Sequence, residues 1–296
     1  GQQASAGEAG GGDGTDARRS AASRSGAMVG TVVVKVNGLP LIDEAIRQYN
    51  PRVLFGLMSG GHDSLCATHL ASQHPLFGGV VHINTGIGIE QTREFVRDVC
   101  KDRKWPLYEY HPPVPYDKIV KEHGFPGPTM HHVMYNRLKE RGLRQLTREH
   151  KKEFKDRILL ASGVRSLEST RRMGTTEPIN KDGARVWVAP IHNWSNHDKN
   201  RYMTHHKLPR NQVVDLLHMS GECLCGAYAR PGEREELRMW YPDVVEEIEA
   251  LEREVEQIPK LRGKCRWGQM PKDPDQMEMA FMPMCSSCID RPQVEA

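Results

Sequence analysis

Short apolar runs alternate with stretches of helical periodicity along the middle of the chain. Because crossover helices join parallel strands and cover both faces of their sheet, the alternation predicts a Rossmann-like α/β fold with a five-stranded parallel sheet and helices on both faces. The predicted strands cover residues 53–58, 79–83, 107–110, 158–164 and 186–191. Helices are predicted over residues 41–49, after Ser64 and over 89–104, and a short edge strand over 32–36.

A glycine turn separates the first of these strands from the helix that follows it. Its sequence is Ser59-Gly60-Gly61-His62-Asp63-Ser64. Glycines let backbone N–H groups converge on a phosphate without a Cβ in the way, and the positive end of the helix dipole adds to the attraction. The turn therefore predicts an anion site. No Gly-Lys-Ser/Thr follows, so the turn is not a Walker A loop. Its sequence does not match the dinucleotide GxGxxG motif either.

Two further segments follow predicted strands and carry polar groups. Asn84-Thr85-Gly86 ends the second strand, and Gly163 to Arg172 follows the fourth strand with three arginines. An arginine fork matches phosphate or sulfate, although a basic loop could also serve only to neutralise nearby acids. Ligands of parallel sheets bind at the carboxyl ends of strands, so we expect all three segments to meet at one crevice.

The SGGxDS motif of the glycine turn resembles the PP-loop of the adenine-nucleotide α-hydrolases. This superfamily includes the ATP pyrophosphatases and the phosphoadenylyl-sulfate reductases. Three more segments resemble the reductase family in the right order: Thr85-Gly86 through Thr92-Arg93-Glu94-Phe95, Gly163 to Arg172, and Ala189-Pro190-Ile191-His192-Asn193-Trp194 with Lys207-Leu208-Pro209 after it. The resemblance covers roughly residues 50 to 235.

The resemblance implies an adenine-nucleotide site, with ATP or an adenylyl-sulfate as the nucleotide and Mg²⁺ bridging its phosphates. Asp63, as a magnesium ligand, and Arg165 and Arg172, beside the departing phosphate charge, are the expected catalytic residues. The expected nucleotide-binding residues are Ser59, Gly60, Gly61, His62, Asp63, Ser64, Asn84, Thr85, Gly86, Gly163, Arg165, Glu168 and Ser169.

Two departures from the family pattern bear on the reaction. The reductases of phosphoadenylyl sulfate carry a catalytic cysteine near the C-terminus, whereas residues 290–296 contain no cysteine. The iron–sulfur reductases carry an adjacent cysteine pair where this chain has Met134-Tyr135. Reductase chemistry of the usual kind is therefore in doubt.

Five of the seven cysteines lie between residues 223 and 288. Cys285 and Cys288 have the two-residue gap that presents two thiolates to one metal. The segment around Cys225 resembles the family's cluster segment, with Cys225 in register and Glu222 in place of another family cysteine. We expect Cys225, Cys265, Cys285 and Cys288 to hold a 4Fe–4S cluster, with Cys223 as the alternative ligand. Spacing alone leaves zinc open. Cys66 and Cys100 are expected in the core.

Composition sets the wider limits. The chain has 296 residues, and 38% of them are hydrophobic. Its net charge of +3 does not by itself indicate nucleic-acid binding. No run approaches membrane-spanning length and no signal-peptide pattern is visible, so a cytoplasmic protein without a membrane partner is expected. Residues 1–27 have a composition typical of a disordered tail or an expression remnant. Residues 28–220 are predicted to form the nucleotide-binding domain, and 221–296 a cysteine-rich extension.

Two charge runs stand out. Residues 137–157 carry nine Lys or Arg against four acids, which suits either a solvated face or a polyanion contact. Residues 233–256 are acidic but have apolar positions at helical spacing, which predicts a solvated helix packed by one face.

The leading hypothesis for function is an ATP-pyrophosphatase-type sulfurtransferase, close in character to the iron–sulfur enzymes of DNA phosphorothioation. It would transfer sulfur to a nucleic acid or nucleotide acceptor, with a desulfurase or a thiol reductant as partner. A sulfonucleotide reductase that releases sulfite is one alternative, and a non-catalytic nucleotide-binding subunit of a larger complex is the other.

Overall fold

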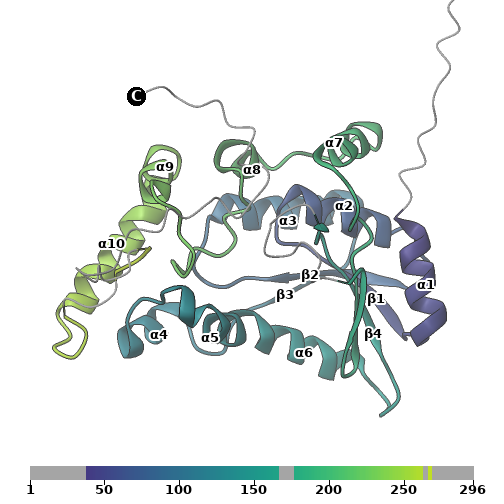
Figure 1. Ribbon diagram of the computed structural model, residues 1–296, viewed down its shortest axis with the longest axis horizontal. Helices are drawn as coiled ribbons and strands as arrows, with labels where there is room; N and C mark the ends of the chain where they lie inside the picture. Colours follow the sequence, from purple (N-terminus) through teal and green to yellow (C-terminus); the bar gives the residue numbers. More distant parts are fainter. Residues whose placement is uncertain (1–37, 167–176, 263–265, 269–296) are drawn as a thin grey trace, which may run out of the picture. The chain divides into compact units, whose positions relative to one another are not determined.

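A mostly parallel sheet organises the chain (Figure 1), which the computed structural model describes over residues 38–166, 177–262 and 266–268. Its strands are β1 (Val53–Leu57), β2 (Phe77–Ile83), β3 (Leu107–Tyr110), β4 (Ile158–Ala161), β5 (Ile179–Asp182) and β6 (Arg185–Val188). They are ordered β3-β2-β1-β4-β6-β5. The α/β fold is confirmed, and the predicted tail and edge strand lie outside the described residues.

The predicted strand number is wrong, because the sheet has six strands within the described residues alone. The additional strand, β5, pairs antiparallel with β6 at the sheet edge. Only Ile179 of its four residues is apolar, so it has no hydrophobic pattern to reveal it. Its signal is the turn: Gly183 follows Asp182 and has φ +59°, as the tight primed turns of hairpins require.

Helices cover both faces of the sheet (Figure 1). One face carries α1 (Leu39–Tyr49), α2 (His62–Ala71), α3 (Glu90–Arg103) and α7 (Asn196–His205). The other carries α4 (Tyr116–His123), the short helix η1 (Pro128–Met130), α5 (His131–Tyr135), the π-helical turn η2 (Asn136–Glu140) and α6 (Arg141–His150). α8 (Gln212–Leu217), α9 (Glu233–Trp240) and α10 (Pro242–Glu256) complete the described elements.

The apolar residues form a cluster on each side of the sheet and a third among the later helices. Leu65, Val96 and Tyr202 belong to the first, Phe55 and Leu146 to the second. The third joins α4 and α5 to α8, α9 and α10. Among the described residues, no helix combines the length and apolar character that crossing a bilayer would need.

The acidic stretch forms two helices rather than the single helix predicted. The break falls between Tyr241 and Pro242, because proline has no N–H to donate and suits the first position of a new helix. The apolar face of α10 is confirmed as buried, and it includes Val244, Ile248 and Leu251.

The strand order reverses between β1 and β4. From β1 the chain proceeds through β2 and β3 to one edge, and from β4 it proceeds to the other. The glycine turn follows β1, and residues 162–164 follow β4, so both segments leave the sheet at this switch point. Open α/β sheets bind their ligands at such a crevice.

Candidate functional site

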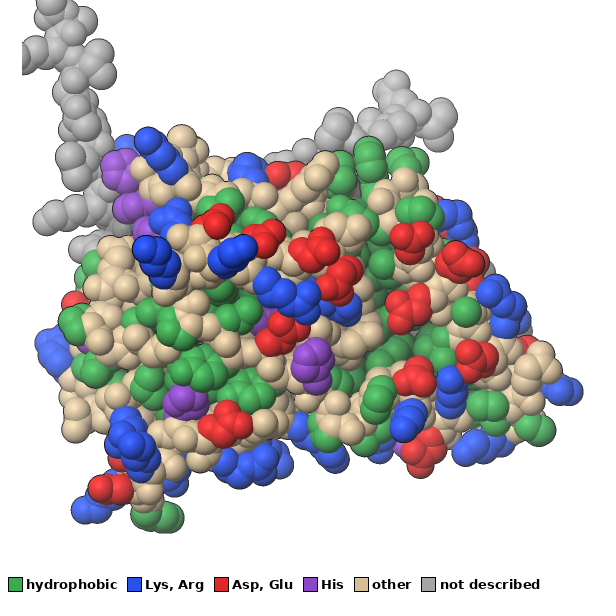
Figure 2. Space-filling view, turned by 180° about the vertical axis from the view of Figure 1, so that it is seen from behind, with side chains coloured by type: hydrophobic (Ala, Val, Ile, Leu, Met, Phe, Trp, Pro, Cys, Tyr) green, Lys and Arg blue, Asp and Glu red, His purple; other side chains and the backbone are tan. Residues whose placement is uncertain are grey.

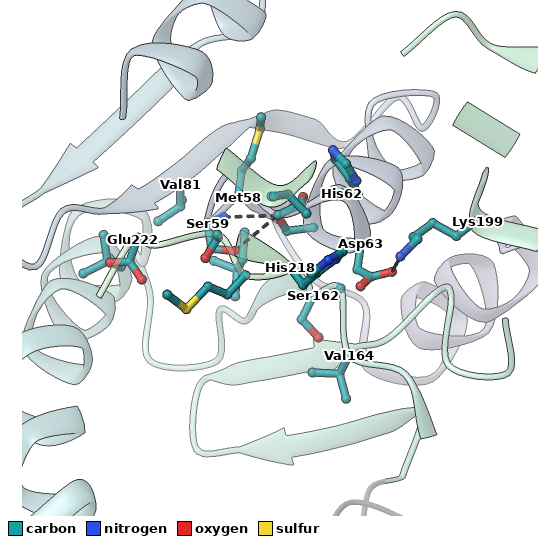
Figure 3. Close-up of a pocket in the computed structure, with 18 of the residues that line it drawn as sticks. Met58, Ser59, His62, Asp63, Val81, Ser162, Val164, Lys199, His218 and Glu222 are labelled. Atoms are coloured by element: carbon teal, nitrogen blue, oxygen red, sulfur yellow. Dashed lines mark hydrogen bonds and ion pairs between the residues drawn. The ribbon is translucent and has the colours of Figure 1, made fainter. Parts of the chain in front are cut away.

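A cavity of about 710 Å³ opens at the switch point, at the carboxyl ends of β1 and β4 (Figure 3). Four segments supply most of its polar lining: the glycine turn, Ser162–Val164, the first turn of α7, and residues 210–222. Of the nucleotide-binding residues expected from sequence, the cavity is lined by Ser59, Gly61, His62, Asp63, Ser64 and Gly163.

The glycine turn is held in shape by its own side chains. The Ser64 hydroxyl donates to the carbonyl of Gly61 at 2.7 Å and accepts from the backbone N–H of Ser59 at 3.2 Å. Gly60 has φ +83°, and a Cβ there would stand 2.4 Å from the Thr92 side chain. The turn therefore needs glycine at residue 60 for its own conformation.

Gly61 and Gly163 differ in what surrounds them. A Cβ on Gly163 would stand 2.5 Å from the backbone nitrogen of Ser64, so the end of β4 touches the start of α2. A Cβ on Gly61 would meet no protein atom closer than 3.6 Å. Because Gly61 also lines the cavity, a side chain at this position would occupy space open to a ligand.

Asp63, in the first turn of α2, meets two cations. Its Oδ1 lies 2.8 Å from Nε of Arg165 and 3.7 Å from Nζ of Lys199 (Figure 3 shows the contact with Lys199). Arg165 is 1% exposed, and it also donates to the Trp194 carbonyl and to the Asn196 side chain. Arg165 thus fastens the end of β4 to α2 and α7, and it does not line the cavity.

Asn211 was not among the expected site residues, yet it holds the glycine turn. Its side chain donates to the carbonyl of Gly60 at 2.9 Å and to the Thr92 hydroxyl at 3.2 Å, and its own backbone N–H donates to Nε2 of His62 at 3.1 Å. Asn211 is 2% exposed and also caps α8. Lys199 and Arg210, which line the cavity, were missed as well.

His62 is neutral in this arrangement. Burial, followed by the charge of Arg210, lowers the pKa of His62 to about 4. The Nε2 atom can therefore accept the hydrogen bond from Asn211 over the physiological pH range.

The far side of the cavity carries a second ion pair. Lys139, on the π-helical turn η2, lies 2.6 Å from the carboxylate of Glu222 (Figure 3 labels Glu222). Burial by itself would lower the pKa of Lys139, but Glu222 and the thiols of Cys223 and Cys225 outweigh it and raise the pKa. A π-helical turn is often found at functional sites.

Asn84, Thr85 and Gly86 stand at the end of β2, outside the cavity lining. The Asn84 side chain donates to Glu109, and the buried Thr85 hydroxyl donates to the carbonyl of Glu222 at 3.0 Å. This segment thus positions Glu222. Glu168, Ser169 and Arg172 lie outside the described residues.

The cysteines that the structure describes form two groups. Cys66 and Cys100 are confirmed as core residues, and burial raises the pKa of each thiol to about 12. Cys223 and Cys225 contact each other next to Glu222. Donation from the Cys223 thiol lowers the pKa of Cys225 to about 7, and the pKa of Cys223 is raised well above its usual value.

The Cys223–Cys225 segment is tied to the chain that follows Cys265. The Trp267 indole donates to the Leu224 carbonyl at 2.6 Å, and its backbone N–H donates to Glu252. Cys265, Cys285 and Cys288 lie outside the described residues. Within the described ranges, no three His, Cys, Asp or Glu side chains gather as a metal-binding group.

The sequence profile of the phosphoadenosine phosphosulfate reductase domain matches residues 54–220, which is more than half of the chain. The chain belongs to this family. The resemblance seen in the sequence is confirmed, and with it the place of the chain in the PP-loop superfamily. No curated protein matches the chain.

Several solved structures are similar to this family member. Phosphoadenylyl-sulfate reductase of Candida auris, in a phosphate complex, shares 18% identity over 62% of this chain and 87% of its own, with a TM-score of 0.46. The FMN adenylyltransferase of Candida glabrata with ATP shares 14% identity over 61% and 57%, with a TM-score of 0.44. The U34-tRNA thiolase of Methanococcus maripaludis, with its 4Fe–4S cluster, shares 15% identity over 78% and 84%, with a TM-score of 0.38.

The buried neutral His62 predicts a loss of stability in acid. Its pKa is lower in the folded state than in the unfolded state, so the unfolded state binds more protons as the pH falls from about 6.5 towards 4. This residue should then cost up to about 3 kcal/mol of the free energy of unfolding. His62→Gln keeps an acceptor for Asn211 and should flatten that part of the curve.

Urea titrations at several pH values measure this effect. His69 and His82, whose pKa values are also lowered by burial, should leave a residual slope in the variant. His123→Gln, at an exposed position of α4, is the control. Equal pH slopes in wild type and His62→Gln would show that His62 is not held neutral.

Proposed function

We propose that the cavity binds an adenine nucleotide and that the chain uses it to replace an oxygen of an acceptor molecule by sulfur. The main observation behind this proposal is that the glycine turn contacts the end of β4 at the switch point of the sheet. The chain also belongs to a family of enzymes. We assign the phosphates to the glycine turn, where Gly61 leaves open space and the first turn of α2 has N–H groups without helical acceptors.

The cations around the cavity have distinct parts in this proposal. Lys199 and Arg210 line the cavity and can balance phosphate charge. Arg165 is a positioning residue that acts through Asp63, because it is buried behind the lining. The ion contacts of Asp63 compete with the role of magnesium ligand that the sequence suggested. Two further roles remain predictions from the sequence. They are the contacts of Glu168, Ser169 and Arg172 with the nucleotide, and the contact of residues 84–86 with the nucleoside.

The proposed reaction has two displacements. An acceptor oxygen forms a bond to the α-phosphorus of ATP while the bond from that phosphorus to pyrophosphate breaks. A hydrosulfide sulfur from a donor protein then bonds to the acceptor atom that carries this oxygen, and AMP leaves with the oxygen. A cationic, preorganised site stabilises the charge that develops on the leaving phosphate.

Cys223 and Cys225 support sulfur chemistry beside this cavity. Their neighbour Glu222 lines it, and Lys139 contacts Glu222 there. Two thiols in contact near a cation suit a soft metal or a cluster. Trp267, two residues beyond Cys265 in the sequence, is held against Leu224. We propose Cys225, Cys265, Cys285 and Cys288 as ligands of a 4Fe–4S cluster, which would help to deliver the sulfur. Cys223 is the alternative ligand, and zinc is the alternative metal.

A sulfonucleotide reductase is the second candidate, because the family profile is that of a phosphoadenosine phosphosulfate reductase domain. The same cavity would then hold an adenylyl-sulfate, and an external thiol would supply the electrons that release sulfite.

Gly61→Val should abolish nucleotide binding and leave the fold intact. The new side chain would stand in open cavity space, since no protein atom lies within 3.6 Å of its Cβ. Gly163→Ala is the matched structural control: its Cβ would press on the backbone of Ser64, so this variant should unfold at a lower temperature. Calorimetric titration with ATP and with adenylyl sulfate, beside thermal melts, measures both effects.

The products then separate the two reactions. Wild type should release pyrophosphate and AMP from ATP when a sulfur donor and an oligonucleotide acceptor are present, and Gly61→Val should not. Sulfite release from an adenylyl-sulfate with a thiol would instead identify a reductase. Normal ATP affinity in Gly61→Val would contradict the assignment of the phosphates to the glycine turn.

The cysteine assignment predicts the metal content. Anaerobically purified protein should contain iron and labile sulfide, and serine at Cys225, Cys265, Cys285 or Cys288 should remove both. Cys100→Ala, in the core of the nucleotide domain, should keep the full content and controls for the loss of a thiol. Stoichiometric zinc without labile sulfide would contradict the cluster and leave the cysteines as a structural zinc site.

A further inference from the structure

A second hollow, which we call the basic hollow, lies at the amino ends of β4 and β6, whereas the nucleotide cavity lies at the carboxyl ends of the strands. It has a volume of about 550 Å³ and lies between the loop that leads into β4 and the turn of the β5–β6 hairpin. Its lining includes Lys151, Phe154, Lys155, Asp156, Arg157 and Lys181. β4 and β6 are parallel and begin here, so the basic hollow faces away from the proposed nucleotide site.

The charge of the basic hollow is strongly positive. Four cationic side chains line it, against the single acid Asp156. Asp156 already forms an ion pair with Arg52, whose guanidinium lies 3.7 Å from the carboxylate. Lys155 and Lys181 are exposed, and neither has an ion-pair partner in the part of the chain that the structure describes. Figure 2 shows Lys and Arg side chains along the lower edge of the molecule, the edge where Figure 1 places α6 and the hairpin.

Phe154 stands out in this basic surrounding because its side chain is 94% exposed. Phenylalanine is among the residue types most often buried, and here its ring presents an open apolar face beside several cations. The Lys151 ammonium lies 5.0 Å from the centre of the ring.

The turn that presents Phe154 is ordered by Asp156. The Asp156 carboxylate accepts from the backbone N–H groups of Lys152 at 2.9 Å and of Glu153 at 3.0 Å. These hydrogen bonds lower the pKa of Asp156. The ring therefore projects from an ordered turn, so the backbone of this turn loses little conformational entropy when a partner binds.

We propose that the basic hollow is a docking surface for single-stranded nucleic acid. Lys151, Lys155 and Lys181 would contact phosphates, and one base would stack on Phe154. Single strands bind proteins by this combination of a cationic groove and an exposed aromatic ring. A duplex keeps its bases stacked on each other and offers phosphates alone. The inference goes beyond the proposed function, because it requires no nucleotide in the cavity.

Fluorescence anisotropy with a labelled single-stranded DNA of about 12 nucleotides tests this surface, a length within the usual range for one binding site. An RNA of the same sequence and the corresponding duplex are measured in parallel. Phe154→Ala should weaken single-strand binding about tenfold by the loss of one stacked base, and should leave duplex binding unchanged. Met239→Ala, at a 73% exposed apolar position of α9, is the matched control and should change neither.

The charge contribution is measured with the double variant Lys155→Gln/Lys181→Gln. Its affinity for the single strand should fall at least about tenfold in low salt, and the slope of log affinity against log salt should decrease by about 1.4, which corresponds to two phosphate contacts. The double variant Lys101→Gln/Lys118→Gln, at exposed positions of α3 and α4, makes the same change in net charge and should bind normally.

Three results would overturn the proposal: equal losses in the two double variants, unchanged single-strand binding by Phe154→Ala, or binding of anionic lipid vesicles in place of oligonucleotides. Gly61→Val should bind the oligonucleotide as wild type does. Failure of the basic hollow and failure of the nucleotide cavity are therefore measured separately.

Discussion

The ion contact between Asp63 and Arg165 joins the parts on which the candidate site depends. Asp63 belongs to the helix that follows β1, and Arg165 to the segment that follows β4. The buried guanidinium also bonds to the Trp194 carbonyl and the Asn196 side chain, at the start of α7. A buried charge left without its partner is strongly destabilising, so this contact holds three cavity walls in one arrangement. Gly163 permits the contact, since any side chain there would separate β4 from α2.

A second constraint sets the shape of the glycine turn from outside it. Asn211 bonds to Gly60 and, through its backbone, to the neutral His62. The positions of the turn and of α8 are thus coupled, and α8 leads directly into residues 219–222 on the far side of the cavity. Thr85 fixes that far side by its bond to the Glu222 carbonyl. The glycine turn and the cysteine-bearing segment are in this way held by one set of hydrogen bonds.

The sequence predicted those parts of the fold that rest on local patterns. β1, β2 and β3 are apolar or aromatic runs, and the glycine turn is a contiguous motif, so both were recognisable. β5 was missed because a solvated edge strand needs no apolar pattern. Asn211 and Lys199 were missed because each reaches the turn from a segment more than 100 residues away in the chain. Arg165 was predicted as a catalytic residue, but its burial depends on tertiary packing that a motif does not reveal.

The central claim is that the amides of the glycine turn receive nucleotide phosphate. Amide hydrogen exchange, followed peptide by peptide with and without ATP, tests it most directly. ATP should slow exchange in the peptides that cover residues 59–65 and 162–166, and it should leave the basic hollow at residues 151–157 unchanged. Unaltered exchange at residues 59–65, together with protection elsewhere in a protein that binds ATP, would contradict the claim.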